Sequence, residues 1–128
     1  MEIVRRCYEL MSSRDFAAFP ELAVPDLVFD LSRNVFNPGV YRGLDGVWRF
    51  VEQVDDMWDG FEAKPEEFID KGDRVIAAVR ISGKGRASGV RADMRIFAIW
   101  TLRDAKVLRV DSGYRSRAEA LEAAGLSE

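Results

Sequence analysis

Asp30 is a candidate general base in this sequence. It lies in the alternating segment LVFDLS, residues 27–32, whose apolar side chains share one face, so Asp30 lies on the opposite face. If that face is turned into a pocket, desolvation would raise the pKa of the carboxyl and suit it to take up a proton. If that face is turned to solvent, Asp30 is an ordinary surface acid.

Arg80 is a candidate partner for that base. It interrupts the apolar run RVIAAVRIS, and an arginine inside a cavity could hold a carboxylate or polarise an epoxide oxygen, with Asp30 or Asp111 completing an acid–base arrangement. The alternative is that Arg80 forms an ion pair across neighbouring strands on a solvated sheet face. Two tyrosines, Tyr8 and Tyr114, are the other candidate donors.

The segment RVDSGY, residues 109–114, is predicted to be a strand, and its alternation decides which polar side chains share a face. Ser112 and Tyr114 lie on one face, and Asp111 lies on the other, where we expect it to pair with a neighbouring arginine. Gly113 could mark a bulge that resets this register, and the assignment of the two faces would then be exchanged.

Composition excludes several kinds of site. The 128-residue chain has no histidine and one cysteine, Cys7, which excludes a histidine-activated nucleophile, a histidine-ligated zinc and an intrachain disulfide. Cys7 is expected to be a small buried apolar side chain. The acidic pairs at 55–56 and 66–67 are adjacent in sequence and their side chains diverge, so we expect no metal and no cofactor.

Charge and hydropathy limit the partners. The net charge is -3, and 19 basic residues are spread among 22 acidic ones, so no basic stripe for nucleic acid emerges. The N-terminal segment MEIVRRCYELMSSRD is amphipathic and interrupted by charge, unlike a signal peptide or a membrane span. We therefore expect a cytoplasmic protein that binds neither nucleic acid nor membranes.

The elements that would position these side chains are helices first and then a meander of strands. Helical spacing predicts a helix at the N-terminus, a short one over residues 15–22 and a third over residues 45–58, with Asp45 as its N-cap. Ser116 and Glu119 form the capping box of a last short helix, and residues 33–43 are a loop.

Strands are expected at 27–32, 61–70, 74–82, 90–102 and 106–114. Without linkers or repeats, residues 1–128 are predicted to form one α+β domain, with helices packed on one face of a curved antiparallel sheet.

Six segments follow one another along nearly the whole chain: RCYELMSSRDFAAF, DLVFDLSRN, YRGLDGVWRFV, GKGRASGV, IWTLRDAKV and RAEALEAAGL. In this order they resemble the SnoaL-like branch of the nuclear transport factor 2-like (NTF2-like) superfamily. The resemblance implies a cone-shaped α+β barrel, often a homodimer joined through the sheet. Members include polyketide cyclases, ketosteroid isomerases and small epoxide hydrolases, so the fold alone does not give a function.

The resemblance also implies which residues occupy the cone. The two oxyanion donors of ketosteroid isomerase fall at Cys7 and Ala98, so steroid isomerisation by that mechanism is not expected. Tyr8 is one residue further on, about 100° around the helix, and cannot simply take the donor position. Tyr114 would be a polar group of the pocket, unless the side chains around it only fill the core. Alternation places Met94, Ile96, Ala98 and Trp100 on one face of the long strand. Together with Trp48, Val110 and Ser112 they either line the pocket or fill the core.

Two hypotheses follow. In the first, the chain binds a small, mainly apolar molecule and has acid–base isomerase, cyclase or hydrolase activity, with Asp30 as base and Tyr8, Tyr114 or Arg80 as donors. In the second, it is a non-catalytic binding or dimerisation module whose cone is filled by its own side chains. The opposite sheet face, with Phe97 and Ile99, would then be an apolar dimer surface.

Overall fold

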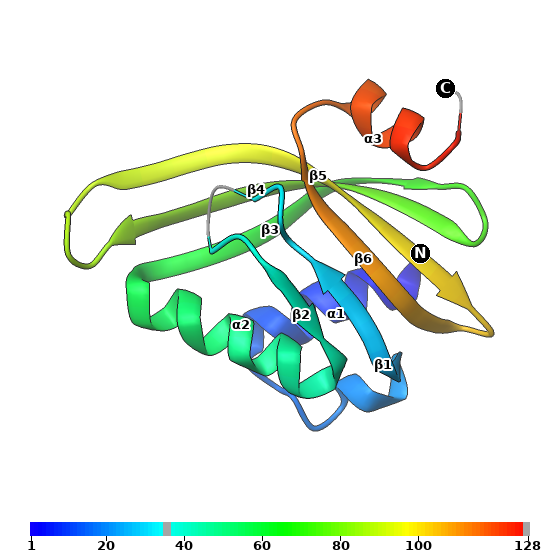
Figure 1. Ribbon diagram of the computed structural model, residues 1–128, viewed down its shortest axis with the longest axis horizontal. Coiled ribbons are helices and arrows are strands. Elements are labelled where there is room, and N and C mark those ends of the chain that lie inside the picture. Colours follow the sequence, from blue (N-terminus) through cyan, green and yellow to red (C-terminus); the bar gives the residue numbers. More distant parts are fainter. Residues whose placement is uncertain (35–36, 127–128) are drawn as a thin grey trace.

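The computed structural model describes residues 1–34 and 37–126. Within them the chain forms three α-helices and one six-stranded sheet (Figure 1). The helices are α1 (Glu2–Ser13), α2 (Gly43–Met57) and α3 (Arg117–Ala123), and a 3₁₀ turn covers Phe19–Glu21. The strands are β1 (Ala23–Asp30), β2 (Val40–Arg42), β3 (Trp58–Asp70), β4 (Arg74–Gly85), β5 (Arg91–Arg103) and β6 (Lys106–Tyr114).

The sheet has the order β2-β1-β6-β5-β4-β3. Every neighbouring pair is antiparallel except β1 with β6, which are parallel. The predicted α+β class is therefore confirmed, with a mixed sheet that is mostly antiparallel. Among the helices that the structure describes, none combines the length and the apolar character needed to cross a membrane.

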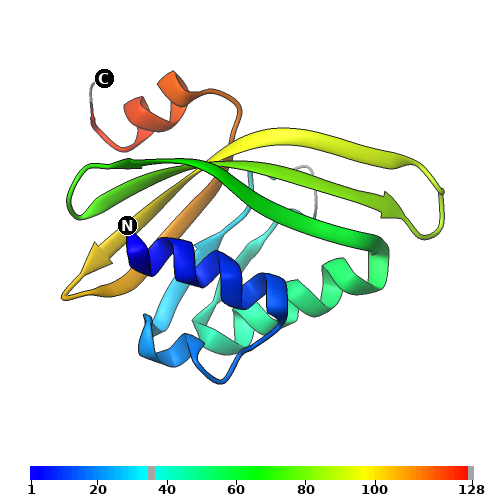
Figure 2. The ribbon, with the colours of Figure 1, turned by 180° about the vertical axis from the view of Figure 1, so that it is seen from behind.

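The curved sheet has a helix layer on each side. Figure 2 shows α1 and α2 against one face, whereas α3 lies against the other. The prediction that all helices share one face is therefore wrong for α3. Successive side chains of β4 point to opposite faces of the sheet. Val75, Ala77 and Val79 belong to the larger core beneath α1 and α2. Ile76 and Ala78 belong to a smaller core beneath α3.

The helix ends follow local chemistry. α1 ends where Arg14 takes a left-handed conformation, with φ of 59°. The predicted cap of α3 is confirmed, because the Ser116 side chain accepts a hydrogen bond from the Glu119 backbone N–H. Asp45 is not the N-cap of α2, which begins two residues earlier; Asp45 lies in its first turn, where a negative charge favours the helix dipole.

Two segments differ from the sequence prediction. The helix expected over residues 15–22 is reduced to the 3₁₀ turn. The loop expected over residues 33–43 contains the short strand β2, which pairs with β1 at the edge of the sheet. Part of that loop lies outside the described residues.

Gly113 resets the register at the end of β6. Ala98 pairs with Ser112 and the preceding residue Phe97 pairs with Tyr114, so one extra residue stands on β6 between them. Gly113 has φ of 109°, which side chains rarely adopt, and the result is a bulge. Ser112 therefore faces α1 and α2, whereas Tyr114 turns to the other side and packs in the core beneath α3.

Candidate functional site

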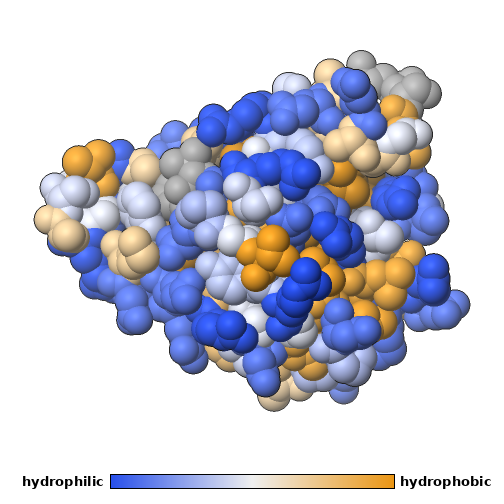
Figure 3. Space-filling view, in the orientation of Figure 1, coloured by the Kyte–Doolittle hydropathy of each residue, from blue (hydrophilic) through white to orange (hydrophobic). Residues whose placement is uncertain are grey.

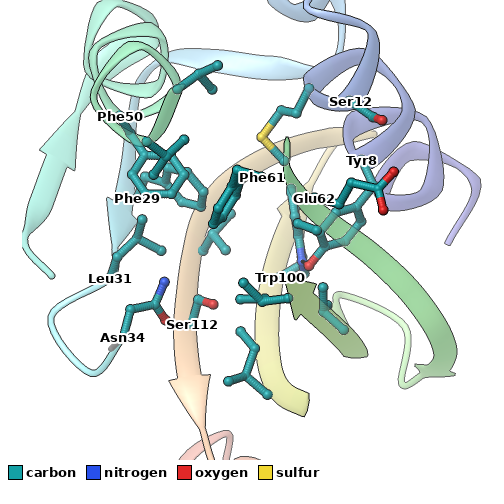
Figure 4. Close-up of a pocket in the computed structure, with 18 of the residues that line it drawn as sticks. Tyr8, Ser12, Phe29, Leu31, Asn34, Phe50, Phe61, Glu62, Trp100 and Ser112 are labelled. Atoms are coloured by element: carbon teal, nitrogen blue, oxygen red, sulfur yellow. Dashed lines mark hydrogen bonds between the residues drawn. The ribbon is translucent and has the colours of Figure 1, made fainter. Parts of the chain in front are cut away.

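A cavity lies between α1, α2 and the concave face of the sheet (Figure 4). Its volume is about 70 Å³. One ordered water needs roughly 10–15 Å³, so the enclosed part has room for several waters, and a ring-sized ligand would extend towards the open side of the cavity. Its walls are mostly apolar and its lining residues are Tyr8, Met11, Ser12, Arg14, Phe29, Leu31, Asn34, Phe50, Val51, Val54, Phe61, Glu62, Ala63, Val79, Ile81, Ile96, Trp100, Val110 and Ser112.

Tyr8 brings a buried hydroxyl, fixed by a hydrogen bond, to the cavity lining. Its side chain is 6% exposed, and its hydroxyl oxygen accepts a hydrogen bond of 3.0 Å from Nε1 of Trp100. The two rings meet edge to face with centroids 5.1 Å apart. Burial raises the pKa of Tyr8, so the hydroxyl keeps its proton. Because its oxygen accepts from Trp100, this hydroxyl is a polarised donor for a ligand oxygen.

Two further polar side chains, Asn34 and Ser112, lie on the other side of the cavity from Tyr8 in the view of Figure 4. Both are buried. Asn34 follows β1 in a turn, and its backbone N–H donates to the carbonyl of Leu31 at 2.9 Å. The apolar walls therefore carry polar groups at separate places, an arrangement that fixes the orientation of a ligand.

The cavity opens towards a surface groove between α1 and β3. Tyr8, Ser12, Glu62 and Ala63 line both the cavity and the groove, so these residues form its mouth. Glu62 is exposed there. Arg14, at the same end, is held by the carboxylate of Asp55, with Nε to Oδ2 at 3.1 Å.

Of the predicted pocket residues, Tyr8, Ile96, Trp100, Val110 and Ser112 line the cavity. Three others belong to the surrounding core. Ala98 is buried in it and Met94 packs against it. Trp48 packs against Phe16 and Phe19, with ring centroids 4.0 and 5.2 Å away.

Asp30 is not in the cavity lining. Leu31 and Phe29, the two inward neighbours of Asp30, line the cavity instead. The Asp30 side chain is 14% exposed, and its Oδ2 accepts a hydrogen bond of 3.1 Å from Arg109. The pKa of Asp30 is lowered, first because the Ser32 hydroxyl donates to the carboxylate. The Asp30 carboxyl therefore lacks the raised pKa that an inward-facing base would have. Its hydrogen bonds with Ser32 instead stabilise the turn that follows β1.

Arg80 and Tyr114 also lie away from the cavity. Arg80 is exposed and forms ion pairs with Glu66 at 3.5 Å and Asp93 at 3.2 Å, which is the cross-strand arrangement considered as its alternative. Tyr114 is on the opposite face of the sheet because of the bulge at Gly113. Its assignment to the pocket is corrected accordingly.

Two other expectations are confirmed. Asp111 pairs with a neighbouring arginine, since Nε of Arg109 donates to its carboxylate at 3.0 Å. Cys7 is fully buried in the core, and burial raises the pKa of its thiol to about 12.

Sequence reasoning missed Asn34, Phe61 and Glu62 as lining residues. Alternation could have found Phe61, which begins the segment predicted as a strand. Asn34 had no such signal, because its loop position becomes part of the site only through contact with β6. In Figure 4 the ring of Phe61 stands between the side chains of α2 and those of β5, so it limits the width of the cavity.

A family model described as a SnoaL-like domain matches residues 4–110 of the chain. Similar solved structures include an NTF2-like protein from Burkholderia thailandensis, with 25% identity and a TM-score of 0.76 over 96% of this chain and 95% of that one. A protein provisionally named a polyketide cyclase, from Sinorhizobium meliloti, has 20% identity and a TM-score of 0.68, covering 88% of this chain and 94% of that one. TerC, crystallised with polyporic acid, has 24% identity and a TM-score of 0.72 over 87% of each chain. No functionally curated protein matches in sequence.

Proposed function

Because this chain belongs to the SnoaL-like domain family, we propose that its cavity binds a small, mainly apolar molecule that carries an oxygen acceptor. One observation carries this proposal: a mostly apolar cavity contains the hydroxyl of Tyr8, oriented by Nε1 of Trp100. The co-crystal of TerC with polyporic acid supports a small organic ligand, since that protein has a similar fold.

The walls supply affinity and Tyr8 supplies orientation. A ligand that buries roughly 150 Å² of apolar surface gains about 4 kcal/mol at 25 cal/mol per Å². A hydrogen bond from Tyr8 adds about 1 kcal/mol, and the loss of ligand freedom offsets part of the sum. The sum is at most about 5 kcal/mol, so dissociation constants of roughly a millimolar follow.

A cofactor-free isomerase, cyclase or hydrolase is the second candidate. It is favoured by the fact that Tyr8 and Glu62 both line the cavity. Tyr8 would donate to a carbonyl oxygen as charge develops on it, and Glu62 would move a proton at the mouth. Among the lining residues that the structure describes, Glu62 is the one carboxylate, so it replaces Asp30 as the base in this second candidate.

The interaction-module hypothesis has less support. Phe97 and Ile99, which would form its apolar dimer surface, are buried beneath α3. In the view of Figure 3, which has β1, β2 and β6 in front, hydrophilic side chains predominate, and apolar ones show near the centre and on the right. Across the described residues, the large apolar side chains that are exposed lie on separate segments: Met1, Val40, Met57 and Val90.

The test is a thermal-shift and calorimetric screen with small ketones, lactones, epoxides and polyketide-like aromatics. A ligand at a hundredfold its dissociation constant stabilises the fold by about 2.7 kcal/mol. For ketones, Tyr8→Phe should weaken binding about five- to tenfold, the loss of one hydrogen bond. Tyr114→Phe is the matched control, because it removes the same hydroxyl on the other side of the sheet. Equal ketone affinities for Tyr8→Phe and the wild type would contradict the proposed role of Tyr8.

A further inference from the structure

Asn34 has a buried amide oxygen without a hydrogen-bond partner. The residue is 9% exposed and lines the cavity, and its Oδ1 is buried without a hydrogen bond. A buried acceptor left unpaired costs stability, and such a group in a folded protein calls for an explanation.

Hydrogen bonds within the turn after β1 fix the position of Asn34. The Asp30 carboxylate accepts hydrogen bonds from the backbone N–H and the hydroxyl of Ser32, at 3.0 and 2.7 Å. The turn closes with the Asn34 backbone N–H on the Leu31 carbonyl. At Gly113 a Cβ atom would lie 2.7 Å from Asn34 Oδ1, so the amide packs directly against a residue without a side chain. The same turn and bulge could have held an apolar side chain there without leaving an acceptor unpaired.

Ser112 brings a second polar group to the same place. It precedes Gly113 on β6, is 6% exposed and lines the cavity. Ser112 pairs with Ala98, and Val110 pairs with Trp100. Ser112 is therefore two residues along the strand direction from the position opposite Trp100, whose indole orients Tyr8. Two residues of a strand span about 7 Å, which is roughly the length of a substituted six-membered ring.

We propose that Asn34 and Ser112 form a second polar subsite, which binds a hydroxyl group of the ligand. This inference rests on the proposed function and deepens it: the ligand carries two oxygens about one ring apart, an acceptor for Tyr8 and a hydroxyl for Asn34. A hydroxyl fits because it both donates and accepts, as does a primary amide. Oδ1 lies against Gly113 in this structure, so a hydroxyl would accept from Nδ2 as the amide stands, and would donate to Oδ1 once the amide turns over. A carbonyl could satisfy only Nδ2, and Oδ1 would stay unpaired.

Three probes of nearly equal shape test this subsite: acetophenone, 4-methylacetophenone and 4-hydroxyacetophenone. All carry the carbonyl that Tyr8 would bind, and only the last carries a hydroxyl on the opposite edge of the ring. Dissociation constants are measured by calorimetry for the wild type, Asn34→Leu, Ser112→Ala and the control Ser82→Ala. Ser82 follows the cavity-lining Ile81 on β4, so its side chain is on the outer face of that strand.

The wild type should bind the hydroxy probe about tenfold more tightly than the methyl probe, the gain expected for one buried hydrogen bond. Asn34→Leu should abolish this preference and still bind acetophenone, Ser112→Ala should reduce it, and Ser82→Ala should leave it unchanged. A wild type that binds all three probes equally would overturn the subsite and leave the proposed function standing. If none of the three binds at millimolar concentration, the proposed function itself fails.

Urea unfolding of the variants without ligand distinguishes a binding role of Asn34 from a purely structural one. An amide kept for binding is a stability cost, so Asn34→Leu should unfold at the same or a higher urea concentration than the wild type. A lower midpoint together with an unchanged preference for the hydroxy probe would show that Asn34 is purely structural, and would overturn the subsite. If the leucine variant does not fold, the loss of hydroxyl preference in Ser112→Ala decides the question.

Discussion

Gly113→Ala should be among the most destabilising glycine substitutions in this protein. Gly113 has φ of 109°, in a region that an alanine adopts only under strain. An added Cβ would also lie 2.7 Å from the Arg33 carbonyl carbon, 2.7 Å from Asn34 Oδ1 and 2.8 Å from the Arg33 Cβ. Two of these neighbours belong to the backbone or its first side-chain atom and cannot rotate away. The turn after β1 must therefore move.

The expected magnitude has two parts. Backbone strain at such a φ costs about 1–3 kcal/mol, and overpacking against a fixed neighbour costs about 1–3 kcal/mol. Together they give about 2–6 kcal/mol, a large share of the stability of a domain of this size. Gly72→Ala is the control, because Gly72 has φ of 82° and nothing within 4 Å of an added Cβ. It should show the strain alone, about 1 kcal/mol.

The assay is urea unfolding followed by tryptophan fluorescence. With a slope of about 1–3 kcal/mol per molar urea, the two midpoints should differ by roughly 1 M. Gly113→Ala should also weaken binding of the hydroxy probe more than that of acetophenone, because the displaced turn carries Asn34. Equal midpoints for Gly113→Ala and Gly72→Ala would refute the close approach of this turn to β6.

Three other predictions concern residues outside the cavity. The Asp30 pKa is lowered, chiefly by the Ser32 hydroxyl, so its contribution to stability is present above the unfolded-state pKa of about 3.9 and lost as pH falls through the folded value. The difference in unfolding free energy between wild type and Asp30→Asn should thus shrink below about pH 4, and a constant difference from pH 7 to 2.5 would contradict this. Cys7, with its pKa raised to about 12 by burial, should react with a thiol reagent at pH 8 no faster than the protein unfolds; labelling within seconds would show it to be accessible. Arg80→Ala should leave the urea midpoint of unfolding almost unchanged, because its ion pairs are exposed, and a clear fall in the midpoint would contradict the assignment.

Much of the fold could be predicted because its periodicities are strong. Helical spacing placed α1, and the turn signals between the strands placed β4, β5 and β6 within a few residues of their observed ends. Alternation assigned Phe29 and Leu31 to the face opposite Asp30, and both line the cavity. These signals come from short stretches of sequence, so they do not depend on contacts with distant segments.

The site could be predicted only in part because it depends on contacts between distant segments. Tyr114 was assigned by alternation, and the bulge at Gly113 reversed its face; the glycine showed that a bulge was available but not that it forms. Asn34 lies in a loop, and only the close approach of that loop to β6 makes it part of the cavity. Trp48 has the right spacing on α2, yet the packing of Phe16 and Phe19 places it outside the lining.

The indole N–H signals of the tryptophans test the central claim most directly. The chain has three tryptophans: Trp100 lines the cavity, Trp48 packs outside it, and Trp58 donates to Asn37 at 3.2 Å. In a ¹⁵N-labelled sample titrated with 4-hydroxyacetophenone, the Trp100 signal should shift in a saturable manner while the signals of Trp48 and Trp58 stay in place. The account would be contradicted by saturable shifts at Trp48 or Trp58 without one at Trp100, or by three signals that do not move at millimolar probe.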